Sequence, residues 1–121
     1  MRAAGNMLTY GVLRGRSRLV VVDRRGDAAI TINGTARKGR RKRGSRTRIL
    51  RTTITNGRIF VRGRRVTVKV RSPKLDISIA GWGRARLRGT GVFSLNEGNR
   101  RAWSTRSGKP RNIKVRARNG R

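Results

Sequence analysis

The sequence predicts an all-β protein, an antiparallel β-sandwich or barrel of short strands, with a short β-solenoid as the alternative. Residues 57–96 carry the main observation, because apolar and polar side chains alternate through them in short segments. In residues 66–71, three valines alternate with Thr, Lys and Arg. A period of two is typical of a strand with one buried face, whereas a helix needs apolar residues three and four apart. Glycines separate the segments, as expected for turns between strands.

Length and composition limit the size of this fold. A chain of 121 residues predicts a single all-β domain over residues 1–121. Apolar residues make up 34% of the chain and aromatic residues 4%, which predicts a thin, mostly aliphatic core. Two basic segments are expected to lie outside that core, a loop at residues 37–48 and a C-terminal tail from about residue 106.

The N-terminal part of the chain predicts three strands, at residues 8–13, 19–22 and 28–32. Asp23 and Asp27 bracket a turn that contains a glycine, and their expected role is to cap that turn. The dipeptide Asn33-Gly34, which follows the third strand, predicts a hairpin.

The most polar segment is residues 37–48, in which eight of twelve residues are Lys or Arg and none is apolar or acidic. Such a segment cannot pack in a core, and as a helix its charges would repel one another. It therefore predicts a long, flexible hairpin loop.

The rest of the chain predicts further short strands. Asn56-Gly57 predicts a second hairpin. Pro73 is expected to end the strand before it, because proline cannot donate a ladder hydrogen bond. These strands are expected at residues 49–55, 58–61, 65–71, 75–80, 84–87, 91–95 and 112–117.

Charge is the strongest signal in the composition. Thirty-four Lys and Arg residues face four acids, for a net charge of +30, and such a surface favours a polyanionic partner. Twenty-eight of the basic residues are Arg and six are Lys. Arg pairs with phosphate through two hydrogen bonds and stacks on bases, which favours nucleic acid. Codon usage in a genome rich in G and C explains the same excess of Arg, and both explanations stay open.

Three groups of basic residues are predicted to bind the polyanion. Arg84, Arg86 and Arg88 alternate along one strand, about 7 Å apart, which is near the spacing of successive phosphates. Arg62 and Arg64 are expected to form a neighbouring row. Binding through phosphate has little sequence preference, and the alternative is a solvated basic face without a partner. The basic loop is expected to add a mobile arm with Arg37, Lys38, Arg40, Arg41, Lys42, Arg43, Arg46 and Arg48.

Two tryptophans are candidates for stacking on bases. Trp82 lies between two glycines and is expected in an exposed turn, so it is the stronger candidate. For Trp103, and as the alternative for Trp82, the role expected of a large aromatic side chain is to fill the core.

The sequence predicts neither catalysis nor a metal site nor a cofactor. Without Cys and His, the chain has no disulfides and no Cys/His metal ligands. The four acids are Asp23, Asp27, Asp76 and Glu97, and no His is present to activate a Ser or Thr nucleophile. The prediction is a polyanion-binding protein that is not an enzyme.

The predicted location of the protein in the cell depends on whether its N-terminus is native. No apolar run reaches the length of a transmembrane helix, and residues 1–15 lack the apolar core of a signal peptide. The protein is expected in the cytoplasm if this N-terminus is native, and outside the cell if a leader has been removed. The choice between DNA and RNA and the oligomeric state stay open.

Three segments, VRGRRVTVKV, GRARLRGTGVFSLN and the later RAW, carry a resemblance over about a third of the chain. In these segments the chain resembles the Arg/Gly-rich repetitive all-β proteins of high-GC actinobacteria. That resemblance implies an all-β fold and transfers no functional residue. Those proteins often carry leader peptides, which residues 1–15 do not resemble, and are assumed to be exported. The alternative function for this chain is that of an exported or surface structural protein with an Arg-rich face. Such a protein would bind anionic envelope polymers or assemble with copies of itself.

Overall fold

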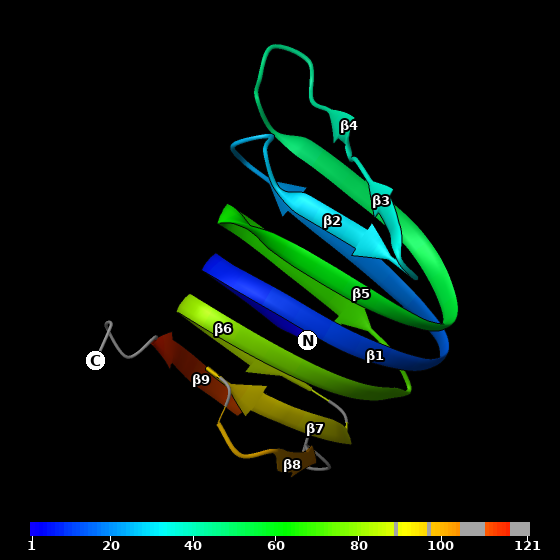
Figure 1. Cartoon of the computed structure of the whole chain (residues 1–121), viewed down its shortest axis with the longest axis vertical. Helices are drawn as coiled ribbons and strands as arrows, with labels where there is room; N and C mark the ends of the chain where they lie inside the picture. The colour runs from blue at the N-terminus through cyan, green and yellow to red at the C-terminus, as the bar shows by residue number, and fades with distance from the viewer. Residues whose placement is uncertain (89, 97, 105–110, 117–121) are drawn as a thin grey trace.

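The computed structural model describes residues 1–88, 90–96, 98–104 and 111–116. These residues contain no helix, so the all-β prediction is confirmed (Figure 1). In particular, they include no helix with the length and apolar character needed to cross a membrane. The strands are β1 (Arg2–Asp23), β2 (Ala29–Ile32), β3 (Thr35–Arg37), β4 (Arg40–Arg41), β5 (Arg48–Arg71), β6 (Lys74–Leu87), β7 (Thr90–Leu95), β8 (Arg101–Ser104) and β9 (Arg111–Arg116).

Three details of the predicted fold class are wrong. The main strands are long rather than short, because β1, β5 and β6 contain 22, 24 and 14 residues. The sheet is mixed rather than antiparallel, because β6 and β7 pair in parallel. It is also not closed into a barrel. The expected breaks were inferred from glycines and Asn-Gly pairs, and at several of these positions the backbone bends while the strand continues.

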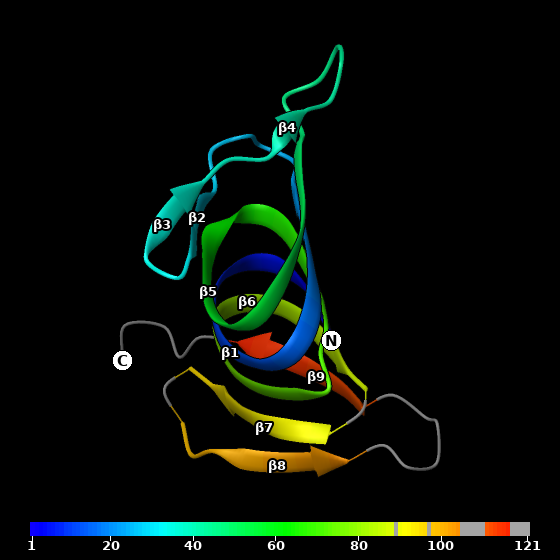
Figure 2. The same ribbon diagram turned by 90° about the vertical axis from the view of Figure 1, so that its right-hand side faces the viewer.

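The long strands wind around the core, as Figure 2 shows for β1, β5 and β6. Val68 of β5 demonstrates this winding, because it pairs with Ala3 on one side and with Val21 on the other. Both partners belong to β1, so β1 curls far enough to meet both edges of the same segment. The molecule therefore has two layers, like a sandwich, that are joined by continuous strands, like a solenoid.

Each layer is an ordered set of strand segments. Across layer 1 the order is β3, β2, residues 57–63, residues 7–13, residues 75–80, β7 and β8. Across layer 2 the order is β4, residues 48–53, residues 18–23, residues 66–71, residues 2–5, residues 83–87 and β9.

Asparagine side chains hold the bends where strands pass between the layers. Asn56 adopts a φ of 51°, and its Oδ1 accepts a hydrogen bond of 2.7 Å from the backbone N–H of Gly15. Asn is one of the few residues that tolerate this left-handed conformation. The hairpin predicted at Asn56-Gly57 is wrong, because β5 runs on through this bend. The hairpin predicted at Asn33-Gly34 is confirmed, since Ile32 pairs with Thr35.

At the other end of the layers, asparagine side chains again accept hydrogen bonds from the backbone of the bends. Oδ1 of Asn6 accepts a hydrogen bond of 2.9 Å from the backbone N–H of Arg65, which has a φ of 52°. Oδ1 of Asn96 accepts one of 2.9 Å from the backbone N–H of Gly81. These bonds satisfy backbone donors that the bends remove from the regular ladder, which a folded chain requires of its polar groups.

The inner faces of both layers form one hydrophobic cluster. Most of its members are Leu, Ile and Val, as the composition predicts, and each fully buried aliphatic side chain contributes roughly 1.5–3 kcal/mol. Trp103 is the largest member, with 3% of its surface exposed. It pairs with Gly91, and a Cβ on that glycine would lie 2.5 Å from the indole ring. The core-filling role predicted for Trp103 is therefore confirmed.

The predicted acidic turn is capped by one of its two acids. Asp23 is 2% exposed, and its carboxylate accepts hydrogen bonds of 3.0 and 2.9 Å from the backbone N–H groups of Gly26 and Ala28. Asp27 instead lies 4.0 Å from Arg25 in an exposed ion pair.

Candidate polyanion-binding face

The outer surface of layer 2 carries exposed basic side chains from β1, β5, β6 and β9. Its strands alternate between buried apolar residues and exposed basic residues, so the charged side chains all leave the same side of the layer. We call this surface the arginine face. Its exposed basic residues are Arg2, Arg18, Arg51, Lys69, Arg71, Arg84, Arg86, Arg88, Lys114 and Arg116.

Like charges face one another directly across the strands of this surface. Arg2 lies opposite Lys69 on one neighbouring strand and opposite Arg86 on the other. Side chains in such positions are about 4.5–5.5 Å apart at Cβ, and equal charges there destabilise the sheet. Since the same register also pairs Arg84 with Lys114, the arrangement repeats toward β9.

None of the acids that the structure describes neutralises this surface. Asp23 is buried in its turn, and Asp27 pairs with Arg25 outside layer 2. Asp76 lies in layer 1, where it forms an ion pair with Arg100. The arginine face is therefore a region of strong positive potential, which concentrates anions from solution.

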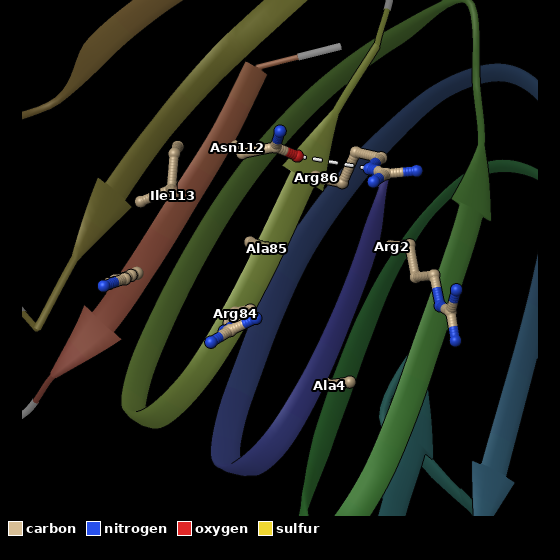
Figure 3. Close-up of a pocket in the computed structure, with 8 residues that line it drawn as sticks. Arg2, Ala4, Arg84, Ala85, Arg86, Asn112 and Ile113 are labelled. Atoms are coloured by element: carbon tan, nitrogen blue, oxygen red, sulfur yellow. Dashed lines mark hydrogen bonds between the residues drawn. The ribbon is translucent and has the colours of Figure 1, made fainter.

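Two adjoining depressions lie on the arginine face. One, of about 430 Å³, is lined by basic residues from three strands, and the second, of about 540 Å³, is the one drawn in Figure 3. Arg2 and Arg86 line both, so the depressions are continuous. Nε of Arg86 donates a hydrogen bond of 3.1 Å to Oδ1 of Asn112, which orients this guanidinium (Figure 3). The basic lining residues are Arg2, Arg18, Lys69, Arg71, Arg86 and Arg88 in the first, and Arg2, Arg84, Arg86 and Lys114 in the second.

The amino group of Met1 lies at the edge of the first depression and donates a hydrogen bond of 2.7 Å to the carbonyl oxygen of Val70. Burial lowers the pKa of this group below its ordinary value of 8.0, and the positive charges of Arg71 and Arg88 lower the pKa further. The pKa of the Met1 amino group is therefore sensitive to the electrostatic potential in this part of the arginine face.

The predicted site residues divide between the two layers. Arg84, Arg86 and Arg88 lie together on the arginine face, the first two on β6 and Arg88 directly after its end. The neighbouring row predicted for Arg62 and Arg64 is wrong. Arg62 pairs with Leu8 and Ala29 in layer 1, and Arg64 lies at the bend that leads from layer 1 to layer 2.

The basic loop at residues 37–48 is a hairpin at the opposite edge of layer 2 from Arg84–Arg88. Its strand β4 pairs with residues 48 and 49, and its turn is closed by a hydrogen bond of 2.7 Å from the Lys42 N–H to the Thr47 carbonyl. Figure 1 shows this hairpin and β9 at opposite ends of the molecule. The strand at 48–53 is four strand spacings from that at 83–87, or about 19 Å along the sheet. The hairpin and the arginines therefore cannot share one phosphate, but one long polyanion can reach both.

The two tryptophans have opposite environments. Trp103 is buried, and its Nε1 donates a hydrogen bond of 3.3 Å to the carbonyl oxygen of Arg88. Trp82 is 46% exposed, as its flanking glycines predicted, but it lies within β6 and not in the expected turn. Its position in β6 is at the bend between the layers, two residues before Arg84.

Sequence reasoning missed seven of the ten basic residues of the arginine face. The alternation in residues 66–71 placed Lys69 and Arg71 on a polar side, but no pattern connected them with Arg84–Arg88. Arg2 precedes any recognisable periodicity, and yet it occupies the centre of the surface. Only the pairing of distant segments could identify these residues.

Comparison with known proteins gives no assignment, since no protein-family model, no curated protein and no solved structure matches the chain.

Proposed function

We propose that this protein binds a polyanion, foremost nucleic acid, through the arginine face and that it catalyses no reaction. The observation that carries the proposal is the position of Arg2 between Lys69 and Arg86, with no described acid nearby. Such a cluster lowers the stability of the unliganded sheet. A row of phosphates would relieve that repulsion, so the same residues that destabilise the protein alone stabilise its complex.

Arginine suits this role better than lysine would. Its guanidinium donates two parallel hydrogen bonds to a phosphate and retains its charge at any physiological pH. Each phosphate that is neutralised releases condensed counterions, so the affinity falls with salt in proportion to the number of contacts. Phosphate contacts carry no base information, and we therefore expect little sequence preference. The hairpin at residues 37–48 extends the same layer and lengthens the path for a polyanion.

The salt dependence of binding tests this proposal. In the triple variant Arg2→Ser, Lys69→Ser, Arg86→Ser, the slope of log affinity against log salt for a single-stranded oligoribonucleotide should become shallower by about 2. The matched control is Arg14→Ser, Arg58→Ser, Arg62→Ser, which removes the same charge from exposed positions outside the arginine face. The control should change the slope much less. Equal slopes for the two triple variants would overturn the assignment of the site to layer 2.

Wild-type binding distinguishes nucleic acid from other anionic polymers. An oligonucleotide, inorganic polyphosphate and an anionic envelope polymer such as teichoic acid should be compared at one salt concentration. Preference for the oligonucleotide supports a nucleic-acid ligand. Preference for the envelope polymer would contradict it and would favour a structural role at the cell surface.

A further inference from the structure

Trp82 is the most exposed large hydrophobic side chain that the structure describes, and it lies two residues before Arg84. Trp82 lies at the bend of β6 between residues 75–80 and 83–87, and the exposed Trp82, Arg84 and Arg86 alternate with the less exposed Gly83 and Ala85. The ring therefore lies beside the arginine face. Across the sheet, Trp82 pairs with Asn6 of β1 and Arg116 of β9. An indole ring thus begins the line of cationic side chains.

The backbone around Trp82 is held tightly. Gly81 has a φ of 116°, and a Cβ there would lie 2.4 Å from the carbonyl oxygen of Asn6. A Cβ on Gly5 would lie 2.1 Å from the carbonyl oxygen of Trp82 itself. This close packing fixes the backbone that carries the ring, while the glycines on either side have no side chains to cover it. Because the backbone is already fixed, only the side chain of Trp82 loses conformational entropy when a flat ligand stacks on it.

We propose that the arginine face binds single-stranded nucleic acid along β6, with an unpaired base stacked on Trp82. Phosphates of the adjoining nucleotides would lie at Arg84, Arg86 and Lys114. This inference rests on the proposed function and names its ligand class. Successive outward residues of a strand are about 6.6–6.8 Å apart, so the strand offers a base platform followed by evenly spaced cations.

The combination of ring and cations selects against other polyanions. Polyphosphate and sulfated polymers offer charge without a flat aromatic face, and a duplex keeps its base faces within its own stack. Stacking on an aromatic side chain is tolerant of sequence, since every base has a π-face. The protein is therefore expected to distinguish unpaired from paired nucleic acid while reading little sequence.

The test compares Trp82→Ala and Trp82→Phe with the wild type on three ligands: a single-stranded oligoribonucleotide, a duplex of the same length and inorganic polyphosphate. Trp82→Ala should weaken binding of the single strand by roughly 5- to 150-fold, the range that base stacking gives on alanine substitution. Binding of duplex and polyphosphate should be unchanged. Trp82→Phe should recover most of the lost affinity, because a phenyl ring still stacks. The single strand should also quench the fluorescence of Trp82, and in Trp82→Phe only the buried Trp103 would remain to emit.

The outcomes separate the two proposals. If Trp82→Ala weakens single-strand binding no more than polyphosphate binding, the stacking inference is overturned and the electrostatic function stands. If the wild type binds neither nucleic acid nor polyphosphate, the proposed function itself fails. The variant Arg84→Ser provides the matched control, because it should weaken the binding of both the single strand and polyphosphate. Since Trp82 lies outside the core, Trp82→Ala should keep the thermal unfolding midpoint of the wild type, and a large drop would contradict the position described for the ring.

Discussion

Arg2 and Lys69 lie directly opposite each other on neighbouring antiparallel strands, so two positive charges share one cross-strand site. Opposite charges at these two cross-strand positions would stabilise the sheet, whereas equal charges destabilise it. Both residues line the same depression as Arg71 and Arg88. The repulsion is a property of the unliganded protein, and several measurements should detect it.

Reversing one charge of this pair should raise stability and reduce binding together. Lys69→Glu places a carboxylate opposite Arg2, and we expect it to stabilise the fold by about 0.2–1 kcal/mol in urea unfolding at low salt. The same change should weaken polyphosphate binding. Lys74→Glu makes an equal change of net charge at an exposed position outside the arginine face. Equal loss of binding in both variants would show that net charge, rather than this surface, controls the affinity.

Occupation of the arginine face should raise the pKa of the Met1 amino group. Its pKa is lowered by burial and by Arg71 and Arg88, and an anion that neutralises these two charges would remove part of the shift. An NMR titration of the N-terminal amine, with and without polyphosphate, measures this effect directly. An unchanged pKa would place the anion elsewhere.

The lowered pKa of the Met1 amino group also determines whether stability rises or falls with pH. Because its folded pKa lies below the ordinary value of 8.0, the folded state binds fewer protons than the unfolded state in the window just below pH 8. Stability should therefore rise with pH through that window. Replacing Arg71 by Ser should raise the folded pKa and flatten this rise, whereas Arg58→Ser in layer 1 should leave it unchanged.

A buried hydroxyl offers a test of the core that is independent of function. Thr9 is fully buried, and its Oγ1 has no hydrogen-bond partner among the residues that the structure describes. Thr9→Val replaces this hydroxyl with a methyl group of similar size, so we expect the free energy of unfolding to increase by about 1–3 kcal/mol. Thr9→Ala should instead destabilise, because it leaves a cavity. A destabilised Thr9→Val protein would mean that the hydroxyl has a partner in solution.

The bend at Asn56 should depend on both its conformation and its hydrogen bond. Asn56→Gly keeps the left-handed φ but loses the bond to Gly15, and it should cost about 0.5–1.5 kcal/mol in denaturant unfolding. Asn56→Ala also forces an alanine into the left-handed region, at roughly 1–2 kcal/mol more. An equal loss of unfolding free energy in the two variants would contradict the left-handed conformation of residue 56.

Local chemistry explains which predictions succeeded. The alternation in residues 66–71 depends on neighbours along the chain, so it correctly separated the buried valines from the exposed Lys69 and Arg71. Thr67, on the same polar side, is nevertheless buried. The Asn33-Gly34 hairpin succeeded for the same reason, since its two strands are adjacent in sequence. Asn56-Gly57 carries the same dipeptide but forms a bend within one strand, because its partner is Gly15. A dipeptide cannot indicate which distant segment will donate a hydrogen bond to its side chain.

The sequence by itself determined the all-β class, the aliphatic core and the large positive charge, because each follows from residue types and a period of two. Only the tertiary structure decided where the charge collects. It placed Arg62 in layer 1 and Arg84 in layer 2, and it placed Arg2 between Lys69 and Arg86. The physical reason is that the register between distant strands depends on how the long strands wind around a shared core, which no local pattern records.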